Sequence, residues 1–375
     1  MIARLATLLC SLLPFLVSLS YAAELSIVKQ DHAGIQVEEI ATGLGITWGM
    51  TFVSSDQLLL TQRAGKIRLL DLKTLQIREI GGVPKLYRKG QGGLLDIAVG
   101  PNYADDGWIY LTYSKSLGSE AVTTLARAKL GESALVNWQD ILISDSATDE
   151  VRHFGSRIAF DGQGHLFVSI GDRGERDEAQ NRSNHIGTIL RLNLDGSLPD
   201  DNPFIELQGA QPEIWSYGHR NPQGLLFDQS TQRLWSIEHG PRGGDEINLI
   251  RKGGNYGWPV ISYGKEYWGP LSVGEGTHKE GMEQPIKQFT PSIAPGSLLL
   301  YRGQAFPKWR GNLFSGALKL THLNRVVLSP DGKAIDEKRL FVDLKQRIRA
   351  LAEDDRGWIY LSTDTGNLWR LRPKP

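Results

Sequence analysis

The chain has 375 residues, and its 42 lysine and arginine side chains are balanced by 42 aspartate and glutamate side chains, so the formal net charge is zero. This balance, without a long basic run, argues against nucleic acid or an anionic membrane surface as the main partner. The 42 glycines and the scarcity of long helical patterns predict an all-β chain with many turns.

The N-terminal segment has the features of a signal peptide. Arg4 lies in a short basic region, an apolar run extends from Leu5 to Leu19, and Ser20-Tyr21-Ala22 forms a small-x-small cleavage site. We expect residues 1–22 to be a signal peptide and residues 23–375 to form one catalytic domain. The protein is then expected to be periplasmic or secreted, without stable membrane insertion after cleavage. An uncleaved membrane anchor is the alternative.

One sequence theme, a turn followed by a short apolar strand, recurs six times along the chain. The six segments are 56–60, 107–111, 164–168, 233–237, 311–315 and 357–361. Their spacing of about fifty to eighty residues suits a four-stranded blade with its loops. The sequence therefore predicts a six-bladed β-propeller, with a double-sheet sandwich as the alternative.

The stretch from Val151 to Arg173 places a histidine and a carboxylate on either side of one hairpin. His153 precedes a short strand, the turn 161–164 follows, and a second strand ends before Asp172. Two strands joined by so short a turn run antiparallel, so His153 and Asp172 are expected at the same end of the sheet. A neutral imidazole oriented by a carboxylate is a general base near neutral pH. A structural histidine is the alternative.

A propeller gathers residues that flank its repeated strands at one mouth of the central channel, even when they are far apart in the sequence. The polar residues in such positions are Gln91, Arg220, Asn221, Lys319, Arg347 and Arg349. The four cations have no matching acidic set in the sequence, so a polyanionic ligand is their expected partner, and solvated surface charges are the alternative. Arg347 and Arg349 alternate on a strand, which puts both guanidiniums on one face.

Several short motifs together resemble those of the soluble pyrroloquinoline quinone (PQQ)-dependent aldose sugar dehydrogenases of the six-bladed glucose/sorbosone dehydrogenase family. The resemblance extends through essentially the whole mature chain. The motifs occupy residues 90–95, 153–157, 212–218, 220–224, 238–241, 245–248, 254–259 and 347–349. One departure is Arg152, which precedes His153 where glucose-specific members carry an acidic residue.

The resemblance implies a role for each matching residue. His153 would be the general base and Asp172 its orienting partner. The residues expected to hold PQQ are Gln91, Arg220, Asn221, Lys319, Arg347 and Arg349. The carbonyl oxygens of Gly240 and Pro241 would help to bind a Ca²⁺ that also touches PQQ. Glu246 and the carbonyl of Tyr256 would bind a structural Ca²⁺, which prefers such oxygen ligands.

The function expected from these residues is the oxidation of an aldose sugar to a lactone. His153 takes the proton of the anomeric hydroxyl, a hydride passes from the anomeric carbon to PQQ, and an unidentified electron acceptor completes the cycle. The alternatives are a calcium-dependent propeller hydrolase that acts on lactones or esters and a non-catalytic carbohydrate-binding propeller. Neither alternative explains why His153 occurs together with the full cationic set.

Overall fold

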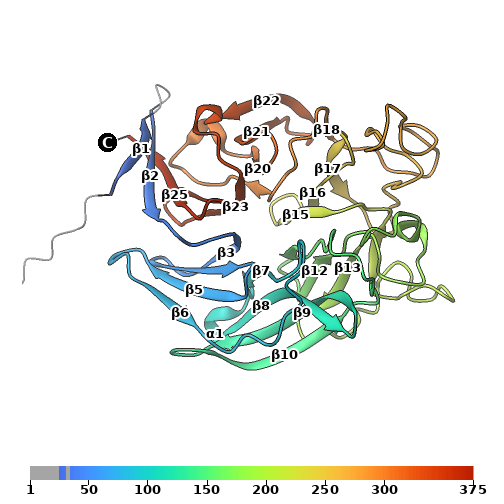
Figure 1. Ribbon diagram of the computed structural model, residues 1–375, viewed down its shortest axis with the longest axis horizontal. Helices are drawn as coiled ribbons and strands as arrows, with labels where there is room; N and C mark the ends of the chain where they lie inside the picture. Colours follow the sequence, from blue (N-terminus) through green and yellow to red (C-terminus); the bar gives the residue numbers. More distant parts are fainter. Residues whose placement is uncertain (1–24, 31–33, 375) are drawn as a thin grey trace, which may run out of the picture.

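A computed structural model describes residues 25–30 and 34–374 of the chain. Figure 1 shows six antiparallel sheets arranged as blades around a central axis. This is the six-bladed β-propeller that the repeats predicted, and the sandwich alternative is wrong. The predicted signal peptide, residues 1–22, lies outside the described residues. In the described part, no helix is long and apolar enough to cross a membrane.

We number the blades in chain order and give the strands of each from the inside outward. Blade one contains β3 (Thr47–Ser54), β4 (Gln57–Gln62), β5 (Lys66–Asp71) and β6 (Ile77–Ile80). Blade two contains β7 (Leu94–Val99), β8 (Trp108–Leu117), β9 (Glu120–Leu130) and β10 (Leu135–Ile143). Blade three contains β11 (Ile158–Phe160), β12 (His165–Ser169), β13 (Thr188–Asn193) and β14 (Ile214–Tyr217). Blades four and five contain β15 (Pro222–Asp228), β16 (Arg233–Glu238), β17 (Asp245–Ile250) and β18 (Lys287–Phe289); and β19 (Leu299–Leu300), β20 (Leu313–Ala317), β21 (His322–Leu328) and β22 (Ala334–Leu340). Blade six contains β23 (Ile348–Glu353), β24 (Ile359–Thr363), β25 (Leu368–Pro373), β2 (Ile35–Ala41) and β1 (Ile27–Gln30). The short helices in the connections are α1 (Tyr103–Asp106), η1 (Arg176–Gln180), η2 (Pro307–Trp309) and η3 (Val342–Leu344).

Blade six closes the ring by joining the two ends of the described chain. β2 pairs antiparallel with β25, with Val37 opposite Leu371, and the two strands lie side by side in Figure 1. Glu38 on β2 forms an ion pair of 2.6 Å with Arg370 on β25. Burial opposes ionisation of Glu38, but its arginine partners outweigh burial and lower the pKa of this carboxyl. The closing contact therefore combines a strand ladder with a buried ion pair.

The six repeated segments of the sequence all fall on the second strand of a blade. These strands read as continuous apolar runs because both faces of a blade are covered by its neighbours. In β4, Leu59 packs in the core between blades one and two, whereas Leu58 and Leu60 pack in the core between blades six and one. In β12, Phe167 likewise faces blade four while its two neighbours face blade two. The recurring apolar segment is therefore the sequence pattern of a strand that is buried on both faces.

Arg157 crosses the central channel and ties blade three to four other blades. Its guanidinium donates to the carbonyls of Gln223 at 2.7 Å and Gly296 at 2.6 Å, and to Asp96 Oδ1 at 3.0 Å. It also lies 3.8 Å from the ring centroid of Trp48, a residue of β3. Each of the three guanidinium nitrogens thus donates a hydrogen bond, and Arg157 forms a cross-brace next to the channel mouth that holds the candidate site.

Candidate active site

The hairpin of β11 and β12 brings His153 and Asp172 together. Asp161 Oδ1 accepts hydrogen bonds from the backbone N–H groups of Gln163 (2.7 Å) and His165 (3.0 Å), which fixes the tight turn. Because the two strands then run antiparallel, His153 and Asp172 lie at the other end of the hairpin. His153 Nδ1 and Asp172 Oδ1 are 2.6 Å apart. The contact predicted from the sequence is present in the structure.

The backbone of His153 adopts a left-handed conformation, with φ of 56°. A hydrogen bond and the close approach of the Gly171 backbone hold it there. The backbone N–H of His153 donates to the side-chain Oε1 of Gln91 at 2.8 Å, and a Cβ atom at Gly171 would come within 2.0 Å of the His153 carbonyl oxygen. A non-glycine residue in this conformation is costly and persists where the surroundings determine it. Gln91 therefore positions His153 through its backbone.

The Asp172 carboxylate is held by three donors. Oδ1 accepts from His153 Nδ1 and from the backbone N–H of Gly174 at 2.9 Å, and Oδ2 accepts from Trp258 Nε1 at 2.8 Å. Burial opposes ionisation of Asp172, but the hydrogen bond and charge of His153 and the charge of Arg220 outweigh it and lower the pKa of the carboxyl. An ionised Asp172 accepts a hydrogen bond from the Nδ1–H group of His153, so the free lone pair of the neutral ring is on Nε2.

The imidazole of His153 is poised to be neutral. Burial is the largest influence and lowers its pKa, the hydrogen bond with Asp172 opposes this effect, and the positive charge of Arg220 adds to the lowering. A neutral imidazole with Nε2 as the acceptor can remove a proton from a hydroxyl group. The pair therefore has the chemistry of a general base with its orienting carboxylate.

A cavity of about 190 Å³ opens beside this pair. Gln91, the hydrogen-bond partner of His153, lines this cavity. Phe154, the next residue in the chain after His153, lines it too. The remaining lining residues are Trp48, Arg63, Leu95, Gly155, Asn221, Gln223, His239, Ala294, Leu318, Arg347 and Arg349. Apolar side chains and three guanidiniums thus surround one space, which suits a flat molecule with several carboxylates.

The structure corrects one expectation about the cations. Asp364 accepts hydrogen bonds from Arg347 Nε at 2.8 Å and from Arg349 Nε at 2.5 Å, so these two arginines do have an acidic partner. Asp364 lies on a different segment from the Arg-x-Arg motif, so the motif gives no sign of this partner. Arg347 lies just before β23, which begins at Ile348, rather than on the strand as expected, but both guanidiniums contact the same carboxylate. The local charge stays positive.

The other predicted cofactor residues occupy different places. Asn221 is buried and lines the cavity. Arg220 is also buried, but it lies in an adjoining small cavity, where it donates to the carbonyls of His239 (3.1 Å) and Gly240 (3.0 Å). Lys319 is exposed; its neighbour Leu318, rather than Lys319 itself, is among the residues that line the larger cavity.

The residues predicted to bind Ca²⁺ gather around the small cavity, which Gly240, Pro241, Glu246 and Tyr256 all line. Glu238 lines it too and lies directly opposite Glu246 in the ladder of β16 and β17. Burial, and after it the charge of Glu238, raises the pKa of Glu246 to about 8. A pKa of about 8 keeps Glu246 mostly protonated at neutral pH, and a divalent cation bound in this cavity would favour its ionised form.

Two of the three carbonyl groups predicted as calcium ligands, those of Gly240 and Pro241, already accept hydrogen bonds. Pro241 O accepts from the Tyr267 hydroxyl at 2.9 Å, and Gly240 O accepts from Arg220. Each carbonyl oxygen has two lone pairs, so one lone pair remains for a cation. Among the residues that the structure describes, no group of three or more histidine, cysteine, aspartate or glutamate side chains could hold a metal ion. A Ca²⁺ ion here would therefore be held mainly by carbonyl oxygens together with a carboxylate such as that of Glu246.

Four residues of the site carry no role in the sequence analysis. Trp258 holds Asp172, Glu238 faces Glu246, and Arg63 adds a third cation to the larger cavity. Arg173 is completely buried, stacks 3.6 Å from the ring centroid of Phe154, and donates to the carbonyl of Glu150 at 2.8 Å, which braces the segment before His153. Glu238 and Trp258 lie inside two of the quoted motifs, which was the signal that could have identified them.

Comparisons with known proteins identify the family of the chain. The family model described as glucose/sorbosone dehydrogenase matches residues 44–370. The aldose sugar dehydrogenase YliI of Escherichia coli (strain K12) is 36% identical over 351 residues, which cover 91% of this chain and 94% of that protein. The crystal structure of the soluble aldose sugar dehydrogenase from Escherichia coli in the apo-form has a TM-score of 0.87 and 34% identity, covering 90% of this chain and 99% of that one. The PQQ-bound form of an aldose sugar dehydrogenase from Streptomyces coelicolor has a TM-score of 0.76 and 27% identity, covering 93% and 98%.

Proposed function

The chain belongs to the glucose/sorbosone dehydrogenase family, and from this premise we propose that it oxidises aldose sugars at the anomeric carbon, with PQQ as cofactor and Ca²⁺ as metal. The observation that carries the proposal is the His153–Asp172 pair, with 2.6 Å between Nδ1 and Oδ1, beside a cavity rich in guanidiniums. Family membership favours an oxidoreductase over the hydrolase and the non-catalytic binder.

The proposed mechanism assigns the proton to His153. Its Nε2 accepts the proton of the anomeric hydroxyl as the C–H bond at the same carbon breaks, and the sugar leaves as a lactone. Asp172 stabilises the imidazolium that forms, because an ionised carboxylate at 2.6 Å favours the charged ring. PQQ, when bound, supplies the two-electron acceptor for the hydride. A separate electron acceptor is then required for each further turnover.

The proposed cofactor site is the larger cavity beside His153. Arg63, Arg347 and Arg349 would pair with the cofactor carboxylates, Gln91 and Asn221 would contact its polar edge, and Trp48 and Phe154 would cover its ring. We assign Arg220 to the boundary with the proposed Ca²⁺ site, since it lines the smaller cavity next to Glu238. We also propose a periplasmic or secreted enzyme, on the basis of the predicted signal peptide at residues 1–22.

Reconstitution tests this proposal. Purified protein without cofactor should gain a visible absorbance band and reduce an artificial electron-accepting dye with aldoses only when both PQQ and CaCl₂ are added. His153→Ala should keep the band and turn over about a hundredfold or more slowly, since general-base catalysis contributes ~10²–10⁴. If no aldose in a substrate panel supports dye reduction, the proposed function is wrong.

The hairpin supplies a matched control for this variant. His165 also contacts a carboxylate, Asp161 Oδ2, at 2.7 Å, but at the opposite end of the same two strands. His165→Ala removes an equivalent histidine–aspartate pair away from the cavity, so it should turn over at the wild-type rate. Equal losses in the two variants would show that the hairpin is merely destabilised and would remove His153 from the mechanism.

A further inference from the structure

A second cavity, of about 410 Å³, lies between blades four and five. Asp228 and Arg233, which line it, lie opposite each other in the strand ladder at one end of β15 and β16. Pro222 and Glu238 lie opposite each other at the other end, which borders the active site. Six residues along a strand correspond to roughly 20 Å. The cavity therefore opens on the face of the propeller opposite the site of the proposed sugar oxidation and is separate from it.

The one carboxylate in the lining, Asp228, is already paired with an arginine of the cavity. Asp228 Oδ1 accepts from Arg302 at 2.5 Å and from the hydroxyl of Ser230 at 2.7 Å, and its Oδ2 accepts from the hydroxyl of Thr231 at 2.6 Å. These donors also outweigh burial and lower the pKa of Asp228. Arg302 and Asp228 thus offset one another's charge, and Asp228 forms no ion pair with the other described arginines of the cavity.

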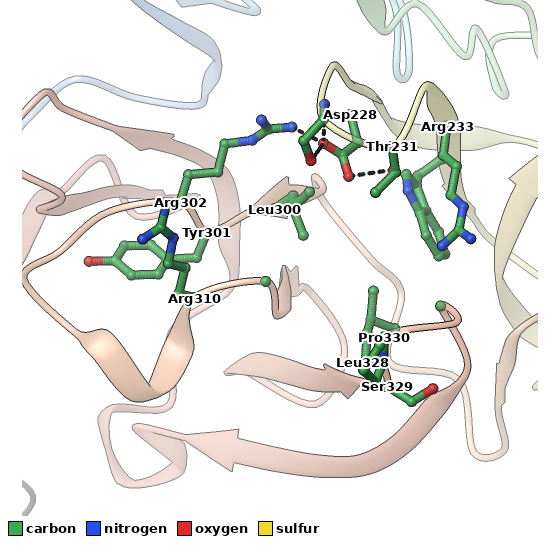
Figure 2. Close-up of a pocket in the computed structure, with 14 residues that line it drawn as sticks. Asp228, Thr231, Arg233, Leu300, Tyr301, Arg302, Arg310, Leu328, Ser329 and Pro330 are labelled. Atoms are coloured by element: carbon green, nitrogen blue, oxygen red, sulfur yellow. Dashed lines mark hydrogen bonds and ion pairs between the residues drawn. The ribbon is translucent and has the colours of Figure 1, made fainter.

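Two further arginines, Arg233 and Arg310, line the same cavity. Neither has a carboxylate within ion-pair distance among the described residues. Figure 2 shows Arg310 on the same side of the cavity as Arg302, and Arg233 on the opposite side, near Thr231. The Arg233 guanidinium packs against the turn at Gly332, where a Cβ atom would come within 2.5 Å of it. The cavity thus carries two positive charges on opposite sides.

The surface between these charges is largely apolar. Trp235, Leu300, Leu328 and Pro330 contribute to the lining, and Trp235 follows Arg233 by two residues on β16, so both side chains lie on one face of the strand. Trp235 is itself buried. An apolar floor with a cation at either side matches a ligand that has an apolar middle and an acid group at each end.

We propose that this cavity binds a small organic acid that carries two carboxylate groups on an apolar frame. One carboxylate pairs with Arg233 and the other with Arg310, each through the planar guanidinium, while the frame rests on Trp235 and Leu328. Two carboxylates are required because the two cations lie on opposite sides of the cavity. The proposal does not depend on the sugar dehydrogenase activity.

Isothermal titration calorimetry with two aromatic dicarboxylates, isophthalate and terephthalate, tests this site. At least one should bind with a Kd of about 1 mM or tighter, whereas benzoate should bind more weakly and the uncharged isophthalamide not at all. Arg233→Gln and Arg310→Gln should each weaken binding about tenfold or more, because each removes a charge-assisted contact. Both variants should keep wild-type turnover of aldoses, since the cavity is remote from His153.

Arg251→Gln is the matched control, because Arg251 is an exposed arginine whose guanidinium is 3.6 Å from Glu283 and is not part of the lining. It should leave the binding of both dicarboxylates unchanged. Thermal unfolding of each variant shows whether the fold is retained. The proposal is wrong if neither dicarboxylate binds at about 10 mM, if isophthalamide binds equally well, or if the two lining variants bind as the wild type does.

Discussion

The indole N–H of Trp258 donates a hydrogen bond of 2.8 Å to Asp172 Oδ2. Trp258 lies two residues after Tyr256, so this bond joins the segment proposed to bind Ca²⁺ to the carboxylate that orients His153. The same indole ring lies 5.2 Å from the Arg220 guanidinium and lines the smaller cavity of the site. Trp258 is therefore a positioning residue for the proposed general base.

Trp258→Phe should lower kcat about two- to tenfold, because it removes one hydrogen bond from Asp172 while a ring still covers Arg220. The Michaelis constant for sugar and the PQQ titration midpoint should stay close to wild type. Trp215→Phe is the control, since Trp215 Nε1 has no hydrogen-bond partner among the described residues and its loss removes no such contact. Equal kcat values for Trp258→Phe and the wild type would argue against this role.

The pH dependence of turnover should report the His153 imidazole. The base acts when it is neutral, and burial lowers its pKa below the ordinary value of about 6.5, so activity should fall only as the pH drops below that value. The hydrogen bond with Asp172 raises this pKa, so Asp172→Asn should move the acid limb to still lower pH while lowering the plateau rate. An acid limb that moves to higher pH in Asp172→Asn would show that another group controls it.

Calcium should stabilise the protein even when PQQ is absent. A ligand that binds only the folded state raises the melting temperature by mass action, and a bound cation would pair with the Glu246 carboxylate once it ionises, opposite Glu238. Adding CaCl₂ to chelator-treated protein should raise Tm, and Glu246→Gln should abolish this rise. Glu275→Gln, at an exposed glutamate paired with Lys279, is the control and should retain it. If neither the chelator nor added calcium changes Tm, the proposed structural site does not exist.

Arg347 and Arg349 should bind the cofactor and not the sugar, because PQQ carries carboxylates and a neutral aldose does not. Replacing either arginine by alanine should raise the PQQ concentration needed for reconstitution about ten- to a hundredfold and leave the Michaelis constant for sugar nearly unchanged at saturating PQQ. Arg349→Ala should also lower Tm, since it deprives the partly buried Asp364 of two hydrogen bonds.

The control for the arginine pair lies on the same blade. Arg356 contacts Asp354 at 2.7 Å, at the opposite end of β23 and β24 from Arg347 and Asp364. Arg356→Ala therefore removes a similar arginine–aspartate contact without touching the cavity and should not change the PQQ titration. Unchanged midpoints in both Arg347→Ala and Arg349→Ala would remove these residues from the cofactor site.

The central cross-brace should contribute strongly to stability. Arg157→Met leaves Asp96 buried without its cation, which typically costs about 3–5 kcal/mol of unfolding free energy. The double variant Arg157→Met with Asp96→Asn should recover part of this loss, because no unpaired charge then remains. Urea denaturation of the single and double variants measures both effects. A single variant as stable as the wild type would contradict the role of Arg157 as a brace.

The sequence by itself determined the fold and the pair at the centre of the site. Both depend on local or repeated patterns: apolar second strands recur because every blade is covered on both faces, and a tight turn forces His153 and Asp172 to one end of their hairpin. The Arg347 and Arg349 side chains meet at Asp364, but Arg347 precedes β23, so this meeting did not follow from strand alternation.

Only the tertiary structure decided which distant groups meet at the channel mouth. Asp364 neutralises part of the Arg347 and Arg349 charge, Trp258 reaches Asp172 from another blade, and Glu238 faces Glu246 through the register of two strands. The cavity between blades four and five has the same origin, since Arg233 and Arg310 are brought to it by neighbouring blades. Such contacts depend on how the blades are rotated around the axis, and short-range patterning carries no information about that rotation.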